Sequence, residues 1–145
     1  MANKIKAYGV CVYRKVNNQY EILLCKSVMS RDKWGFLKGV VIGNEGIEDT
    51  ALREFEEESS IQINKKYFEE FFIQENESKD IGIYLLNANN IKSLDTYFTN
   101  NSLKNNYLSW ENSKVEFFNL NKLPSIKSKQ TVILNCIFEV LVNKA

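Results

Sequence analysis

The first forty residues alternate between dense apolar runs and short polar segments. Residues 5–14 and 20–27 are rich in β-branched and aromatic side chains, which favour strands. Between them, Val16-Asn-Asn-Gln19 has the composition of a tight turn. The pattern therefore predicts two strands joined by a turn, and residues 34–41 predict a third extended segment.

A helical period replaces this pattern from about Ile47 onward, with acidic residues on the polar face. The apolar stripe of the predicted helix consists of Ile47, Ala51, Leu52 and Phe55. Asn44 and Glu45 stand just before this helix. We therefore expect them to cap its first amide groups and to complement its dipole.

The second half of the chain predicts three more strands. Residues 67–74 and 80–87 flank a polar turn at 75–79, and residues 114–120 form a shorter apolar run. Residues 93–108 are ambiguous, with only a weak helical pattern, and we interpret them as an insertion that could lie over the functional site.

A second amphipathic helix is predicted to close the chain, beginning near Lys127. Its apolar positions are Val132, Ile133, Ile137, Phe138, Leu141 and Val142. Strands combined with two such helices favour a mixed α/β or α+β fold. Because the 145 residues contain no Pro-rich, Gly/Ser-rich or repeated segment, residues 1–145 are expected to form one domain.

Charge and hydropathy exclude several kinds of partner. The formal net charge of +1 provides no concentrated basic field for a membrane surface or for stable binding of nucleic acid. The N-terminus lacks the apolar segment of a signal peptide, and no run approaches the ~20 apolar residues of a membrane span. We therefore expect a soluble, cytoplasmic protein without a membrane partner.

Histidine is absent from the chain, which excludes catalytic triads with histidine, histidine-ligated zinc and imidazole acid–base catalysis. Cys11, Cys25 and Cys136 are far apart and lie among apolar residues, which favours buried thiols over disulfides, a metal site or a nucleophile. Any chemistry must therefore depend on carboxylates, lysine or metal-bound water.

The acidic residues are concentrated in one segment, with seven of them in the fourteen residues from Glu45 to Glu58. On a helix, Glu54, Glu57 and Glu58 have the i, i+3, i+4 spacing that places them on one face. A solvated helix face is the common alternative, but lysines would then be interleaved, and none lies between Glu54 and Glu58. Carboxylates this close repel one another unless protonated or neutralised by Mg²⁺ or Mn²⁺, which prefer oxygen ligands.

This segment resembles the Nudix box, G-x5-E-x7-R-E-U-x-E-E-x-G-U, in which U is apolar. The matching residues are Gly39, Glu45, Arg53, Glu54, Phe55, Glu57, Glu58 and Ile61. Ser60 stands where the family has a glycine, which suggests a left-handed residue that ends the helix. The resemblance implies the Nudix fold, a mixed β-sheet sandwiched between helices, and a Mg²⁺- or Mn²⁺-dependent hydrolase.

The resemblance also implies roles for individual residues of the box. Glu57 and Glu58 match the metal-ligating pair, and Glu54 matches a glutamate that ligates metal or acts as the base. Arg53 matches the arginine that pairs with these carboxylates and orients them.

Two further matches in the box concern the backbone and the loop before the helix. Gly39 matches a position whose carbonyl approaches the metal, and Glu45 matches a supporting residue that holds the loop to the helix.

Two segments outside the helix are similar to one subgroup of the family, the asymmetrically cleaving dinucleoside tetraphosphate hydrolases. Residues 33–40 are similar to its W-x-P-P-K-G-H-V motif, and residues 108–117 to its L-S-H-E-H segment and following strand. Glu111 then matches a further catalytic or metal-binding glutamate. The chain departs from the subgroup at Val40 and Trp110, which replace histidines, and it lacks the proline before the motif lysine.

Five residues are candidates for substrate binding by their chemistry. Lys38 and Arg31 could contact phosphates, whereas Tyr84, Tyr107 or Trp110 could stack on a base.

The expected function is metal-dependent hydrolysis of a nucleotide polyphosphate, with dinucleoside tetraphosphate as the first choice and ATP and AMP as products. Within the same class, the alternatives are removal of pyrophosphate from RNA 5′ ends, which would require an RNA partner, and sanitation of nucleoside triphosphates. From another class, the alternative is a catalytically silent nucleotide-binding or regulatory module. The intact set of Arg53, Glu54, Glu57 and Glu58 argues against that alternative.

Overall fold

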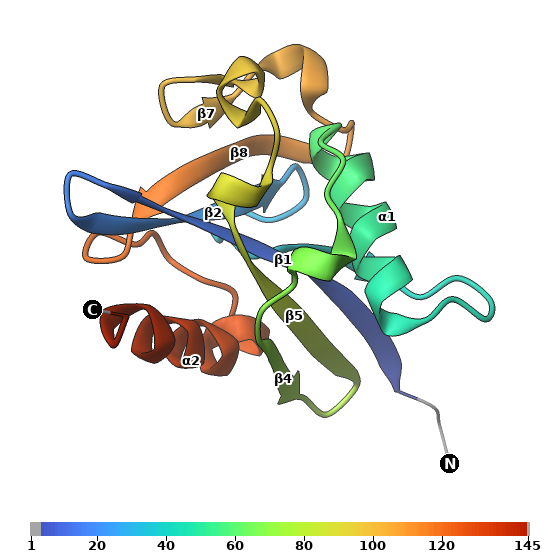
Figure 1. Ribbon diagram of the computed structural model, residues 1–145. Helices are drawn as coiled ribbons and strands as arrows, with labels where there is room; N and C mark the ends of the chain where they lie inside the picture. Colours follow the sequence, from blue (N-terminus) through green and yellow to red (C-terminus); the bar gives the residue numbers. More distant parts are fainter. Residues whose placement is uncertain (1–3, 145) are drawn as a thin grey trace.

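The computed structural model describes residues 4–144, which form an eight-stranded mixed sheet with a helix on each face (Figure 1). The strands are β1 (Ile5–Val16), β2 (Gln19–Ser27), β3 (Leu37–Val40), β4 (Phe71–Glu75), β5 (Lys79–Asn87), β6 (Phe98–Thr99), β7 (Ser102–Leu103) and β8 (Asn112–Asn119). The helices are α1 (Ile47–Ser59) and α2 (Thr131–Val142). The 3₁₀ turns are η1 (Lys65–Tyr67), η2 (Ala88–Asn90), η3 (Leu94–Tyr97), η4 (Asn105–Tyr107) and η5 (Ser128–Gln130). This architecture confirms the predicted fold class.

Strand β1 is the centre of the sheet, whose order is β4-β5-β1-β2-β8-β7-β6. β1 pairs with β5 in parallel and with β2 and β3 in antiparallel orientation. β3 pairs with residues 7–10 of β1, whereas β2 pairs with residues 13–16. One edge of β1 is therefore divided between two partners, and the sheet opens between β2 and β3.

The two helices cover opposite faces because side chains alternate along β1. Val10 and Val12 belong to the core beneath α1, together with Phe55. Cys11 belongs to the second core, beneath α2, where Ile137 is fully buried. Each helix thus buries its apolar stripe against its own face of the sheet. Figure 1 shows the two helices on opposite sides of the sheet.

The predicted strands agree with the observed ones, apart from a few residues at their ends. The turn after β1 contains Asn17 and Asn18, both with positive φ, which asparagine tolerates better than most residues. Tyr67 was expected in a strand but lies in the 3₁₀ turn η1, and β4 begins only at Phe71. Residues 93–108, which the sequence left ambiguous, form the 3₁₀ turns η3 and η4 and the short β6–β7 hairpin.

Two further expectations were wrong in detail. The N-cap of α1 is Gly46 and carries no side-chain cap, so Asn44 and Glu45 do not cap the helix. Cys136 is exposed, because α2 turns that position outward, whereas Cys11 and Cys25 are buried as expected. Ser60 does end α1 in the left-handed conformation, at φ 66° and ψ 5°.

None of the helices in residues 4–144 combines the length and the apolar character that crossing a membrane would need.

Candidate functional site

The position of α1 over the sheet determines where its acidic side chains lie. Ala51 and Phe55 are fully buried and fix the helix against β1. Ile47, at the other end of the predicted stripe, is 41% exposed, so the first turn contributes less to the core. With this face buried, the opposite flank of α1 brings Glu54 and Glu58 next to β3.

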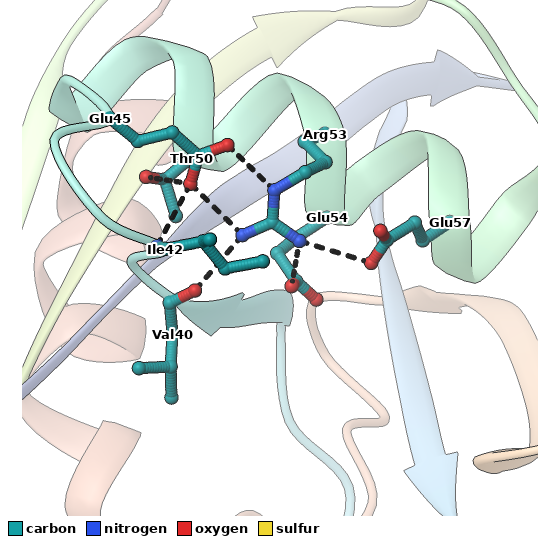
Figure 2. A network of polar contacts seen from close by, with 7 residues as sticks. All are labelled: Val40, Ile42, Glu45, Thr50, Arg53, Glu54 and Glu57. Carbon is teal, nitrogen blue, oxygen red and sulfur yellow. Dashed lines mark hydrogen bonds and ion pairs between the residues drawn. The ribbon is translucent and has the colours of Figure 1, made fainter.

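Figure 2 shows the guanidinium group of Arg53 at the centre of a polar network. Its Nη1 donates to Glu54 Oε2 at 2.6 Å and to Glu57 Oε2 at 3.1 Å. Its Nε and Nη2 donate to both carboxylate oxygens of Glu45, at 2.7 and 3.0 Å. Nη2 also donates to the carbonyl oxygen of Val40 at 2.9 Å. Arg53 therefore contacts three carboxylates and the last carbonyl of β3.

Glu45 connects the loop before α1 to the helix itself. Besides Arg53, its Oε1 accepts hydrogen bonds from the Ile42 amide at 3.1 Å and from the Thr50 hydroxyl at 2.9 Å. Hydrogen bonding from Arg53 and from the Ile42 amide lowers the pKa of Glu45 to about 2. The side chain stays ionised at neutral pH and holds the loop in place.

Gly39 allows β3 to approach α1 closely. A Cβ atom at this position would collide with the carboxyl group of Glu54. Glycine therefore meets a requirement for space here, because any side chain would displace the carboxylate. Burial raises the pKa of Glu54, and the Arg53 ion pair only partly opposes this effect.

Glu58 is the most deeply buried acid of the helix, with only 7% of its surface exposed. Its hydrogen bond from Asn112 Nδ2 is long, at 3.5 Å. Burial raises the pKa of Glu58 to about 8, although the nearby Lys38 favours the ionised form. Burial and repulsion from Lys79 lower the pKa of Lys38 to about 8. A bound cation would compensate the charge of Glu58 better than these neighbours do.

These groups face a pocket of about 450 Å³ between α1, β3 and the loops near β8. Its polar lining includes Lys38, Gly39, Glu54, Glu58, Glu111 and Lys127. Carboxylates and ammonium groups thus lie in one cavity, which suits a ligand made of a cation and an anionic chain. Cys25 also lines this pocket, but burial raises the pKa of its thiol far above the ordinary range, so it stays protonated.

Glu111 lines the pocket from the loop before β8. Its carbonyl oxygen accepts a hydrogen bond from the Val28 amide at 2.9 Å, which ties this loop to the end of β2. The carboxylate itself is exposed, so water or a ligand can contact it.

Glu57 differs from the other two glutamates of the motif. Its side chain is 54% exposed and contacts Arg53 instead of lining the pocket. Within residues 4–144, no three acidic, cysteine or histidine side chains converge closely enough to enclose a metal ion as they stand. The physical reason is that Arg53 holds both Glu54 and Glu57 in ion pairs.

Four of the residues suggested for substrate binding do not line this pocket. Tyr84 stacks on Phe68, with ring centroids 4.4 Å apart, and belongs to the core beneath α1. Tyr107 packs against Tyr97, and its carbonyl oxygen accepts a hydrogen bond from Ser60. Arg31 and Trp110 are exposed on loops, Trp110 to 85%. Only Lys38 lines the pocket.

Sequence reasoning missed four polar residues of the pocket, namely Ser27, Asn112, Lys127 and Gln130. Asn112 directly follows Glu111, so proximity in sequence could have suggested it. Lys127 and Gln130 precede α2 and meet β3 only through tertiary contacts, such as the hydrogen bond from the Phe36 amide to Gln130 Oε1 at 2.7 Å. No local signal marks them.

The available donors match the preferences of a hard divalent cation. Glu54 and Glu58 offer carboxylate oxygens in the same pocket as Gly39, and the buried Glu58 lacks a close cationic partner in an ion pair among the described residues. Oxygen-rich sites of this kind suit Mg²⁺ or Mn²⁺. The residues present therefore fit such an ion.

Comparison with proteins of known structure supports the fold. Ap4A hydrolase from C. elegans, in a binary complex, is 22% identical over 95% of this chain and 98% of its own, with a TM-score of 0.67. The NUDIX domain of NrtR from Shewanella oneidensis, complexed with ADP ribose, is 13% identical over 97% of this chain and 90% of its own, with a TM-score of 0.71. A MutT protein from Methanosarcina mazei is 17% identical over 99% of this chain and 100% of its own, with a TM-score of 0.64.

Among curated proteins, no relative matches the sequence. The NUDIX domain family, however, matches residues 5–135, which include every strand and the box helix. Together with the Arg53 network and the carboxylates around Gly39, this match shows that the chain belongs to the Nudix hydrolase family.

Proposed function

We propose that this protein is a Mg²⁺- or Mn²⁺-dependent pyrophosphohydrolase that acts on nucleoside polyphosphates, with a dinucleoside tetraphosphate as its preferred substrate. The observation that carries the proposal is a pocket lined by both carboxylates and lysines, in which Glu58 is buried. Such a lining can hold a divalent cation on one side and phosphate oxygens on the other. We propose that the chain acts as one domain.

The metal would be held by Glu54 and Glu58 with the carbonyl oxygen of Gly39, and by Glu57 once its carboxylate leaves Arg53. When bound, such an ion neutralises charge that develops on the phosphates. Glu54 or Glu111 would accept the proton of the water that attacks phosphorus. Arg53 would keep these carboxylates oriented, since it already contacts Glu54 at 2.6 Å.

The choice of substrate rests on two observations outside the box. Glu111 lines the pocket from a segment similar to that of the asymmetric tetraphosphate hydrolases, and Lys38 lines it from the similar segment before the box. The likeness to the C. elegans Ap4A hydrolase covers nearly the whole of both chains. Attack away from the centre of the phosphate chain would yield ATP and AMP from diadenosine tetraphosphate.

The test is a panel of nucleotides incubated with Mg²⁺ or Mn²⁺, followed by chromatographic identification of the products. Diadenosine tetraphosphate should be cleaved to ATP and AMP faster than nucleoside triphosphates or triphosphorylated RNA. Cleavage to two molecules of ADP, or faster release of pyrophosphate from RNA 5′ ends, would refute the assignment of the preferred substrate. Neither result would contradict the proposal that the protein is a hydrolase. Inactivity on the whole panel would favour a silent binding module.

The variant Glu57→Gln, compared with Glu56→Gln, tests the metal-binding residues. We expect Glu57→Gln to lower turnover by ~10²-fold or more, because a charge that stabilises the transition state is lost. The neighbouring Glu56 is exposed and does not line the pocket, so Glu56→Gln should keep near-normal turnover. Equal activities of the two folded variants would contradict the assignment of Glu57.

A further inference from the structure

A second pocket, of about 390 Å³, adjoins the pocket that contains Glu54 and Glu58 and has a different chemical character. Its charged lining consists of Lys33, Lys38, Lys79, Lys127 and Lys129. The two pockets share Lys38, Lys127 and Gln130, so these residues form the wall between them. No acidic residue among residues 4–144 lines the second pocket.

The lysines of this second pocket, the lysine pocket, are not neutralised by the protein. Among the described residues, none of the five takes part in an ion pair. Burial lowers the pKa of Lys79, and repulsion from Lys129 and Lys127 lowers it further. Unpaired ammonium groups held this close are stabilised when an anion occupies the space between them.

Gln130 adds a hydrogen-bond donor that points to a ligand. The residue is 98% buried, its Oε1 accepts from the Phe36 amide at 2.7 Å, and its side chain lines both pockets. In the described part of the chain, its Nε2 donates to no protein acceptor. Gly35 makes room for the amide, because a Cβ there would collide with it. Because no buried side-chain nitrogen or oxygen among the described residues lacks a partner, this unpartnered NH₂ group must be accessible from the cavity. An accessible amide donor on an otherwise buried side chain suits an acceptor such as a phosphate oxygen.

The segment that carries these groups is held firmly. The Lys127 amide donates to the Trp34 carbonyl at 3.0 Å, and the Ser128 carbonyl accepts from Gln74 Nε2 at 3.1 Å. The Lys129 carbonyl accepts from Asn76 Nδ2 at 3.1 Å. The turn η5 is therefore anchored to β4 and to the strand segment before β3, and its lysines start from a fixed backbone.

We propose that the lysine pocket is a second anion site, formed by Lys79, Lys127, Lys129 and the Nε2 of Gln130. One phosphate of the substrate is held at the carboxylates, and this site binds the phosphates that follow it in the chain. The inference rests on the proposed function for the source of the anion, a chain of several phosphates. A ligand that spans both pockets places one phosphate beside Glu54 and Glu58 and the next ones past Lys38 and Lys127. The site then favours long phosphate chains over single phosphate groups.

Binding of inorganic tripolyphosphate to the metal-free protein, measured by calorimetry in EDTA, tests this site without catalysis. The variant Lys127→Gln/Lys129→Gln should weaken binding at least fivefold. The matched control Lys92→Gln/Lys122→Gln removes the same charge from exposed positions outside both pockets, and its affinity should stay within twofold of the parent. Gln130→Glu keeps the acceptor for Phe36 and replaces the free donor by a carboxylate, so it should also weaken binding.

Inorganic phosphate should bind at least tenfold more weakly than tripolyphosphate if the site holds a chain. Equal affinity for the two anions would assign the site to a free ion and overturn the proposal. The proposal would also be overturned if the control variant weakened tripolyphosphate binding as much as Lys127→Gln/Lys129→Gln, or if tripolyphosphate did not bind. Because this measurement needs neither metal nor turnover, failure of the nucleotide panel would leave its result intact. Conversely, an active hydrolase without tripolyphosphate binding would reject only the lysine pocket.

Discussion

Replacing Glu58 by glutamine should make the metal-free protein more stable at alkaline pH, even though the variant should be inactive. Glu58 is 7% exposed, and its one side-chain hydrogen bond in the described structure is the 3.5 Å contact with Asn112. Its ionised form is therefore poorly solvated. An ionised carboxylate in this environment lowers the stability of the folded protein. We expect this loss of stability to accompany the proposed role of Glu58 as a metal ligand.

The magnitude follows from the pKa of Glu58, which is about 8 in the folded protein against 4.5 for the ordinary side chain. At ~1.4 kcal/mol per pH unit, this difference corresponds to about 5 kcal/mol at pH 8.5. Glutamine must itself be desolvated and leaves part of its amide unpaired, which offsets about 2 kcal/mol. The net gain expected for Glu58→Gln is about 2–3 kcal/mol.

The direction of the pH dependence is determined by which state binds the proton more tightly. Below pH 4.5 the carboxyl group is protonated in both states and has no effect. Between pH 4.5 and about 8 the folded state retains a proton that the unfolded state has lost, so stability falls as the pH rises. Glu58→Gln removes this slope, and its advantage should grow from pH 5 to pH 8.5.

The assay is equilibrium unfolding by guanidinium chloride in EDTA at these two pH values, with Glu56→Gln as an exposed control. Addition of Mg²⁺ at pH 8.5 should stabilise the unmodified protein and have a smaller effect on Glu58→Gln, because binding to the folded state adds stability. If Glu58→Gln is less stable than its parent at pH 8.5, or if the difference does not change with pH, the reasoning about burial is refuted.

Two further variants test the end of the helix and the loop before β8. Ser60→Gly should raise the free energy of unfolding by about 0.5–1 kcal/mol. Glycine relieves the left-handed strain, and the lost hydrogen bond to the Tyr107 carbonyl offsets part of this gain. Chemical unfolding measures the difference, and a clear loss of stability would contradict the prediction. Glu111→Gln should lower kcat about tenfold with little change in KM, as expected for a contribution made in the transition state; steady-state kinetics with diadenosine tetraphosphate measure the two, and unchanged kinetics would make Glu111 a solvated loop residue.

Local sequence determined much of this protein. The i, i+3, i+4 spacing of Glu54, Glu57 and Glu58 and the apolar positions Ala51 and Phe55 define which face of α1 is buried. The alternation and composition of the apolar runs likewise predict the main strands. These features are local because helical and strand periodicity repeat within a few residues.

Only the tertiary structure decided how the acidic residues differ from one another. Three glutamates on one helix look equivalent in sequence, yet Glu58 is buried beside Asn112 while Glu57 is half exposed on Arg53. Their environments come from β3 and β8, which approach α1 through contacts between distant parts of the chain. Burial and ion pairing depend on these neighbours, and so do the pKa values.

The same holds for the residues that sequence reasoning missed. Lys127 and Gln130 line the same pockets as Lys38 only because the turn η5 is held beside the residues that lead into β3. About ninety residues separate the two segments in the chain. Conversely, Tyr84 and Tyr107 have suitable chemistry for stacking but are engaged by Phe68 and Tyr97. Residue type defines what a side chain can do, and the packing of distant segments decides which partner it contacts.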